Sequence, residues 1–398
     1  MSTPLSIPPP LMTSEPGSFA RLTIVERKPQ IIRQVIQDNA YSSDIVAGLE
    51  TFIQEITDSP IRPLQESAPD VSFWNAELAA YSGNTWLEIP WYFAETYFYR
   101  RLLELTCYFQ PGSWQGQNPF QKQKMSLMEA DIQRLAPMWE QFYALKPKAL
   151  FEGLLHSCLW GNRADLSNFT IQVKASGGLA TRKHRHLILI NHTDQVRELL
   201  AARVQRADFI NDNVGSELLF DLALADFLLR EGWVRQVTMH LKNQPFFVSD
   251  AMQDDVQSTI AILKVVPSVS MRELGARLEN ELVDGKLNIT TDPFWTSCLM
   301  FRQMPPHLQA QLAQADLVLL KGDVNYRRLL DDAHWPFTTR MEDVTSYFPA
   351  SFVALRTLKG EIMVGLEPGQ AEAISAKDPT WLINGRRGVI HLVRKPSK

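Results

Sequence analysis

The chain has 398 residues and a formal net charge of −4, and no run of lysine or arginine stands out. Its hydrophobic content of 45% and charged content of 21% are typical of a soluble globular protein, and its length allows two domains. The slightly acidic balance argues against nucleic acid as the main partner. No stretch reaches the about 18 apolar residues that a membrane-spanning helix needs, and the three cysteines lack C-x-x-C spacing. With no signal-peptide pattern at the start, we expect a cytoplasmic protein without a membrane partner.

The first part of the chain is predicted to be helical. Residues 1–18 form a leader rich in proline and serine, and apolar residues recur at helical spacing from Phe19 onward. Pro90 stands where a proline commonly opens a helix, so a helix is expected over Trp91–Tyr108. We therefore expect an extended leader followed by a mostly helical N-terminal subdomain over residues 19–170.

The second part of the chain, residues 171–398, alternates short apolar runs with helical patterns. Strands that alternate with helices form βαβ units, so this part is predicted to be an α/β fold with a mostly parallel sheet and right-handed crossovers. The expected strands cover residues 187–190, 207–210, 234–240, 245–248, 287–290, 317–320, 352–355, 362–366 and 389–393.

Three of these expected strands end on polar residues that could bind a metal or a phosphate. Asp212 and Asn213 follow one strand, Asp250 follows a second, and the run Lys321–Arg327 follows a third. Ligands in an open α/β sheet bind outside the carboxyl ends of the strands, so we expect one site built from all three segments. Two carboxylates and one amide oxygen would fill half of an octahedral shell around a hard divalent cation.

Each of these segments also has a purely structural interpretation. Asp212 and Asn213 could cap a helix, and Lys321–Arg327 could be a solvated junction between a strand and a helix. Arg356 and Lys359, which follow another expected strand, favour an anion site slightly. The pair Gly177–Gly178 lacks the spacing of a dinucleotide fingerprint or a P-loop.

Together these segments resemble the metal-dependent damage-control phosphatases of the acidic-residue-methyltransferase type. The resembling subgroup, subfamily III, carries an Arg-Thr-x-Lys motif, which here is Arg356-Thr357-Leu358-Lys359. Ser216 and Asn118 depart from the family pattern, which more often has an aromatic residue and an aspartate there. The resemblance covers most of the chain and includes Trp86–Arg100, Leu159–Ser167, Asp212–Glu217, Val248–Asp250 and Lys321–Arg327.

The resemblance implies a helical N-terminal subdomain packed on a Rossmann-like three-layer α/β/α sandwich. It implies a divalent metal (manganese, cobalt, nickel or magnesium) held by the residues that match Asp212, Asn213 and Asp250, which would also be the catalytic residues. The residues that it implies as substrate contacts are Asp212, Asn213, Asp323, Val324, Asn325, Tyr326, Arg327 and Lys359.

The function implied is hydrolysis of small phosphorylated metabolites, with sugar phosphates such as fructose 1-phosphate or fructose 6-phosphate as substrates. Two alternatives stay open: an S-adenosylmethionine-dependent protein carboxyl (glutamate) methyltransferase, and a non-catalytic sugar-phosphate-binding protein. No glycine-rich junction suits the methyl donor, and no protein partner is evident. Whether water or Asp212 is the nucleophile is left open.

Three polar residues of the helical part are also expected near the cleft, because buried polar groups need partners that the hydroxyls of a sugar could supply. These residues are Glu95, Asn162 and Asp165. The alternative is that they cap helices or pair with Arg100 and Arg163.

Overall fold

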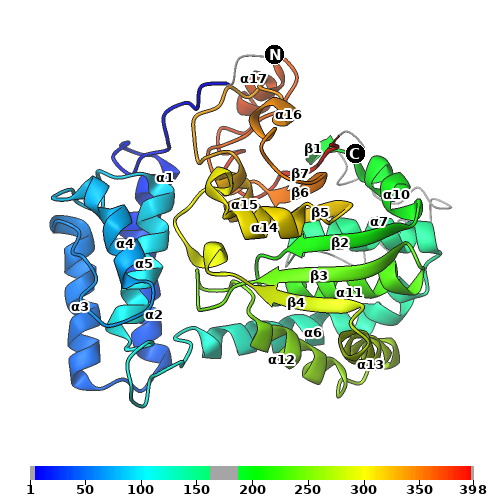
Figure 1. Ribbon diagram of the computed structural model, residues 1–398, viewed down its shortest axis with the longest axis horizontal. Coiled ribbons are helices and arrows are strands. Elements are labelled where there is room, and N and C mark those ends of the chain that lie inside the picture. Colours follow the sequence, from blue (N-terminus) through cyan, green and yellow to red (C-terminus); the bar gives the residue numbers. More distant parts are fainter. Residues whose placement is uncertain (1–4, 162–186, 396–398) are drawn as a thin grey trace.

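The protein, described here from a computed structural model over residues 5–161 and 187–395, is built around a seven-stranded sheet with the order β1-β7-β6-β5-β2-β3-β4 (Figure 1). All neighbouring strands are parallel except β6 and β7, which run antiparallel. The predicted α/β class with a mostly parallel sheet is therefore confirmed. The strands are β1 (Ile188–Asn191), β2 (Val204–Ile210), β3 (Val234–Leu241), β4 (Leu287–Thr291), β5 (Leu317–Lys321), β6 (Phe352–Thr357) and β7 (Gly388–Val393).

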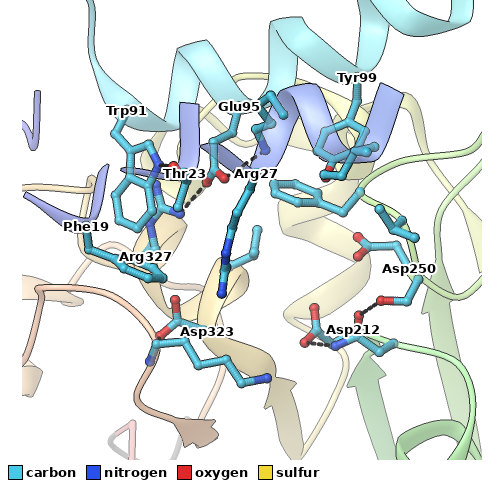
Figure 2. A pocket seen from close by; sticks show the side chains of 18 residues that line it. Phe19, Thr23, Arg27, Trp91, Glu95, Tyr99, Asp212, Asp250, Asp323 and Arg327 are labelled. Atoms are coloured by element: carbon cyan, nitrogen blue, oxygen red, sulfur yellow. Dashed lines mark hydrogen bonds and ion pairs between the residues drawn. The ribbon is translucent and has the colours of Figure 1, made fainter. Parts of the chain in front are cut away.

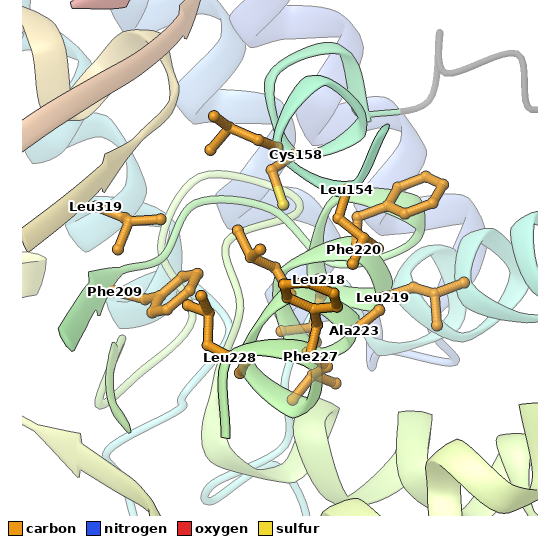
Figure 3. Close-up of a cluster of buried hydrophobic side chains, with 14 of the residues drawn as sticks. Leu154, Cys158, Phe209, Leu218, Leu219, Phe220, Ala223, Phe227, Leu228 and Leu319 are labelled. Atoms are coloured by element: carbon orange, nitrogen blue, oxygen red, sulfur yellow. The ribbon is translucent and has the colours of Figure 1, made fainter. Parts of the chain in front are cut away.

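Both faces of the sheet are buried, which explains why β5 and β6 are nearly continuous apolar runs. Successive side chains of a strand point to opposite faces, so Phe209 and Leu319 join one core whereas Ile210 and Leu320 join the other. In the first core, Leu218 and Phe227 of the helix α11 (Ser216–Arg230) belong to the same buried cluster as Phe209 (Figure 3). Burial on both sides is the usual environment of a parallel sheet.

Helices cover the two faces of the sheet (Figure 1). On one face of the sheet, α11 contacts α6, α7 and α13, and α6 contacts α13. On the other face, α15 packs against β5 and β6. The helices of this part are α6 (Gln121–Tyr143), α7 (Pro147–Trp160), α10 (Thr193–Ala201), α11 (Ser216–Arg230), α12 (Gln253–Leu263), α13 (Val269–Val283), α14 (Pro306–Leu312), α15 (Gly322–Leu329), α16 (Met341–Val344) and α17 (Gln370–Ser375), with 3₁₀ turns η4 (Pro293–Thr296) and η5 (Phe301–Gln303). None of the helices in these two described ranges is long and apolar enough to cross a membrane.

The N-terminal helices form a separate, aromatic-rich core beside the sheet. Phe52 stacks on Phe98 with ring centroids 5.4 Å apart, and Trp86 packs edge-on against Phe52 at 5.6 Å. Aromatic pairs of this kind add stabilisation beyond the area that they bury. The elements are α1 (Phe19–Leu22), the π-helical turn η1 (Thr23–Arg27), α2 (Lys28–Asp38), α3 (Ser43–Asp58), α4 (Val71–Leu78), the 3₁₀ turn η2 (Ala79–Tyr81) and α5 (Trp91–Leu105).

The helices α6 and α7 share their core with the sheet. Trp139 of α6 stacks on Phe220 of α11 with ring centroids 5.7 Å apart, and both residues are fully buried. The leader also makes contacts: the backbone N–H of Leu11 donates to the Asp332 carbonyl at 2.8 Å, and Leu11 itself is buried. The boundary expected near residue 170 falls outside the described residues, so that division stays a prediction.

Two segments predicted as strands, residues 245–248 and 362–366, are loops, so these predictions were wrong. In the first, Pro245 has no N–H to donate to a ladder, and Phe246 belongs to the aromatic core of the N-terminal helices. In the second, the Gly365 N–H donates to the Thr339 carbonyl. The apolar side chains of both loops are buried in tertiary packing, which sequence periodicity does not distinguish from burial in a sheet.

Candidate active site

A cavity of about 300 Å³ lies between the N-terminal helices and the carboxyl edge of the sheet (Figure 2). The sheet register explains its position: Ile210 pairs with His240 on one side and with Leu320 on the other, so the segments that follow β2, β3 and β5 begin at one level. The lining residues are Phe19, Thr23, Arg27, Lys28, Ile31, Trp91, Glu95, Tyr99, Asp212, Asn213, Phe247, Val248, Ser249, Asp250, Asp323, Val324, Arg327 and Lys359.

The loops after β2 and β3 are joined by backbone hydrogen bonds at this cavity. Asn213 and Asp250 form an antiparallel bridge, the Ala251 N–H donates to the Asp212 carbonyl at 2.7 Å, and the Val214 N–H donates to the Ser249 carbonyl at 2.7 Å. Asp250 therefore reaches the site although its segment is not a strand end. The expected convergence of Asp212, Asn213 and Asp250 is present in the structure.

The side chains of this cluster are held by further hydrogen bonds. Nδ2 of Asn213 donates to Asp212 Oδ2 at 2.7 Å and to Glu217 Oε2 at 3.2 Å, whereas its Oδ1 accepts from the Ser249 hydroxyl at 2.6 Å. Gly322 leaves the space that Asp212 occupies, because a Cβ at Gly322 would lie 1.9 Å from Asp212 Oδ2. The positions of these carboxylate and amide groups thus depend on one another.

The electrostatics of the cluster favour a bound cation. Burial, together with the charges of Glu217 and Asp250, raises the pKa of Asp212 well above its ordinary value. Burial raises the pKa of Asp250 to about 6, although Lys242 Nζ lies 3.3 Å from Asp250 Oδ2 and acts in the opposite direction. Carboxylates that are buried beside one another are costly to ionise, and a divalent cation would offset that cost.

The donor atoms fit a hard divalent metal. Asp212 and Asp250 offer carboxylate oxygens and Asn213 an amide oxygen, which are the ligands that magnesium and manganese prefer. No group of three or more His, Cys, Asp or Glu side chains suited to a metal is found within residues 5–161 and 187–395. A metal at this position would therefore use the Asn213 amide as its third protein ligand.

On the opposite side of the cavity, Asp323 organises the Arg-Thr-x-Lys segment. Its Oδ1 accepts from Arg356 Nε at 2.7 Å and from the backbone N–H of Lys359 at 3.0 Å. Arg356 is fully buried and also donates to the Gly360 carbonyl at 2.9 Å, so it is a structural cation. The Lys359 side chain is exposed and lines the cavity, and its role as a substrate contact stays a prediction.

Arg327 lines the cavity but uses most of its donors inside the protein. Its Nε and Nη2 donate to Asp332 at 2.7 and 2.8 Å, its Nη1 donates to Glu95 at 2.6 Å, and its guanidinium lies 3.3 Å from the centre of the Trp91 indole. A largely saturated, stacked guanidinium mainly holds the N-terminal helices against α15.

The remaining residues of the third segment divide between the cavity and the interior. Val324 lines the cavity, whereas the Asn325 side chain donates to the Lys321 carbonyl at 2.9 Å and the Tyr326 ring lies under the Arg356 guanidinium at 4.2 Å. Both Asn325 and Tyr326 are buried. Lys321, expected to add charge at an anion site, is buried and paired with Asp221 at 2.9 Å.

Glu95 lines the cavity, as expected, and its ion-pair partners are not the Arg100 and Arg163 considered from the sequence. It bridges Lys28 Nζ at 3.0 Å and Arg327 Nη1 at 2.6 Å. Burial raises the pKa of Glu95, but the two adjacent cations outweigh this effect and bring it below the ordinary value. The other two residues expected at the cleft, Asn162 and Asp165, lie outside the described residues.

Sequence reasoning missed three basic residues around the cavity. Arg27 and Lys28 come from the start of the N-terminal helices, and Lys242 follows the end of β3. Lys242 follows an expected strand end, which is the same signal that identified Asp212. Nothing in the local pattern around Arg27 and Lys28 marks them as site residues, because two adjacent basic residues on a helix are usually solvated.

Comparison with known proteins supports a family assignment. The sequence model of the damage-control phosphatase ARMT1-like domain matches residues 23–374. The chain belongs to this family. It is 33% identical to the damage-control phosphatase ARMT1 of Mus musculus, over 96% of this chain and 97% of that protein. It is 32% identical to the Homo sapiens protein of the same name, over 96% of this chain and 98% of that protein.

A solved structure of a DUF89 family protein from Pyrococcus horikoshii also matches. It is 14% identical with a TM-score of 0.49, covering 95% of this chain and 98% of that one. The match to the ARMT1-like family confirms the resemblance drawn from the motifs. Membership of this family supports a phosphatase role in metabolite repair, in which the substrates are small and phosphorylated.

Proposed function

We propose that this chain is a metal-dependent phosphatase of small sugar phosphates, with fructose 1-phosphate and fructose 6-phosphate as substrates and manganese, cobalt, nickel or magnesium as the metal. The observation that carries the proposal is that Asp212, Asn213, Asp250 and Lys359 all line a single cavity. A phosphate dianion needs cations on more than one side, and a metal and a lysine would supply them.

The proposed roles follow from what each side chain contacts. Asp212, Asn213 and Asp250 would hold the metal, which when bound polarises the phosphoryl group and offsets its charge. Lys359 would bind outer phosphate oxygens, and Asp323 would keep the Lys359 backbone in place through the 3.0 Å hydrogen bond. Arg327 and Glu95 would hold the wall of the cavity that faces the sugar.

Phosphate release tests this proposal. The wild-type protein with manganese should liberate inorganic phosphate from fructose 1-phosphate or fructose 6-phosphate, and the same protein with a chelator should not. Micromolar binding of S-adenosylmethionine without metal, together with no phosphate release, would favour the carboxyl methyltransferase alternative. Saturable binding of the sugar phosphates without turnover would indicate a non-catalytic binding protein.

Removal of Lys359 should separate substrate binding from metal binding. Lys359→Ala loses a charge-assisted contact, so kcat/KM should fall about ten- to a hundredfold while the manganese affinity stays near that of the wild type. Asp250→Ala should lose manganese affinity first, because it removes a proposed ligand. Manganese titrations of both variants, each followed by turnover, measure the difference.

The control is Lys377→Ala, which removes an exposed lysine near the end of α17, away from the cavity lining. It should match the wild type in both measurements. A loss of manganese affinity in Lys359→Ala as large as that in Asp250→Ala would contradict the proposed division of roles.

A further inference from the structure

The cations that line the cavity fall into two groups. Lys28 and Arg327 are buried and share the Glu95 carboxylate, and Arg327 also pairs with Asp332, so two carboxylates of the protein already balance their charge. Lys359 and Arg27 are exposed, and within the described residues neither side chain has a hydrogen bond or an ion pair. The charge available to an incoming anion therefore comes from these two residues, one on each part of the protein.

Arg27 extends into the cavity from the N-terminal helices. Figure 2 shows its side chain between Asp323 on one side and Asp212 on the other. Its guanidinium lies 5.1 Å from the centre of the Phe19 ring, which orients the side chain without using its hydrogen-bond donors. An arginine with free donors between two carboxylates is placed to share an anion with a metal bound beside Asp212.

The backbone conformation around Arg27 supports this placement. Residues Thr23–Arg27 form a π-helical turn, closed by a hydrogen bond from the Lys28 N–H to the Thr23 carbonyl. Pro29 follows at the start of α2 and cannot donate to the preceding turn, which favours a local irregularity in the helix. Single π-helical turns inside helices frequently occur at functional sites.

The turn that carries Arg27 is held on both sides. The Thr23 hydroxyl accepts from the Trp91 indole N–H at 2.8 Å, and the neighbouring Lys28 pairs with Glu95 at 3.0 Å. The backbone of Arg27 is thus anchored to α5 while its guanidinium is free. Little ordering of the backbone is then required when Arg27 binds a ligand.

We propose that Arg27 is a substrate-binding residue that contacts phosphate oxygens, opposite the proposed metal ligands and together with Lys359. This inference rests on the proposed phosphatase function and extends it, because it assigns part of the phosphate site to the N-terminal helices. The planar guanidinium suits two oxygens of one phosphate, a geometry that lysine cannot reproduce.

Binding of inorganic phosphate tests the role of Arg27 without turnover. Calorimetric titration of phosphate into the magnesium-loaded wild type should give saturable binding. Arg27→Gln should raise the dissociation constant for phosphate about ten- to a hundredfold. The phosphate affinity of Arg27→Lys should fall between those of the wild type and Arg27→Gln. With fructose 1-phosphate, Arg27→Gln should raise KM more than it lowers kcat, and its magnesium affinity should be unchanged.

The matched control is Arg33→Gln, which removes an exposed arginine of α2 that does not line this cavity. It should bind phosphate like the wild type, and all variants should unfold at the same urea concentration, since Arg27 is exposed. Equal phosphate affinity of Arg27→Gln and the wild type would overturn the assignment, as would a wild type that binds no phosphate. A wild type that binds phosphate but hydrolyses no sugar phosphate would contradict the proposed function alone.

Discussion

Replacement of Asp212 by asparagine is expected to reduce phosphate release from fructose 1-phosphate by at least about 10²–10³-fold, the range that loss of one charge-stabilising group produces in an active site. The substitution keeps the shape of the side chain and removes its charge. Asp212 is buried next to Asn213 and Asp250, which are themselves proposed metal ligands, so the substitution removes one of only two carboxylates from this proposed set of three ligands. Turnover with saturating manganese measures the loss.

The control for this variant is Asp194→Asn, because the Asp194 side chain is 66% exposed in the first turn of α10 and belongs to no part of the cavity. It should retain wild-type turnover. The Asp212→Asn protein should remain folded, since burial disfavours the charged form of that carboxylate. Undiminished turnover by Asp212→Asn would contradict the assignment of the active site.

Replacement of Gly322 by alanine is expected to cause a loss of activity as large as that of Asp212→Asn. The added Cβ would lie 1.9 Å from Asp212 Oδ2 and 2.3 Å from its Cγ, so the carboxylate must move away from Asn213 and Asp250. Gly322 also has a φ of +85°, a conformation that costs alanine about 1–2 kcal/mol. We therefore expect a destabilised protein with little activity at any manganese concentration.

Gly369→Ala separates the two effects of that substitution. Gly369 has a φ of +79°, and a Cβ there meets no atom within 4 Å. The free energy of unfolding of the Gly369→Ala protein should fall by about 1–2 kcal/mol, the cost of a positive φ for alanine. Its turnover should be that of the wild type. Equal turnover of Gly322→Ala and Gly369→Ala would show that the position of Asp212 does not depend on the missing side chain of Gly322.

The polar ends of expected strands were the productive signal in the sequence. Asp212 and Asn213 follow β2, and Asp323 follows β5. These residues line one cavity because the parallel register brings the ends of the two strands to one level. Asp250 was placed correctly for a wrong reason. Its segment was predicted as a strand, whereas it is a loop that reaches the site by bonding to the loop after β2.

The charged residues show where the sequence was least informative. Lys321 and Arg327 lie six residues apart in a segment expected to bind an anion, and both are buried in ion pairs with carboxylates of the protein. Arg27, in contrast, belongs to an ordinary helical pattern, and its guanidinium is free. Whether a cation is available to a ligand depends on its partners, and those partners lie far away along the chain.

The sequence by itself determined the α/β class, the helical N-terminal part and the identity of the residues that follow β2 and β5, because periodicity and strand-end chemistry are local properties of the chain. Only the tertiary structure decided that Asp250 joins Asp212 through a loop, that Glu95 bridges Lys28 and Arg327, and that Arg27 shares a cavity with Lys359. The physical reason is that burial and charge pairing arise from contacts between residues far apart in the chain, such as Glu95 and Arg327, which are 232 positions apart, and no local pattern encodes such contacts.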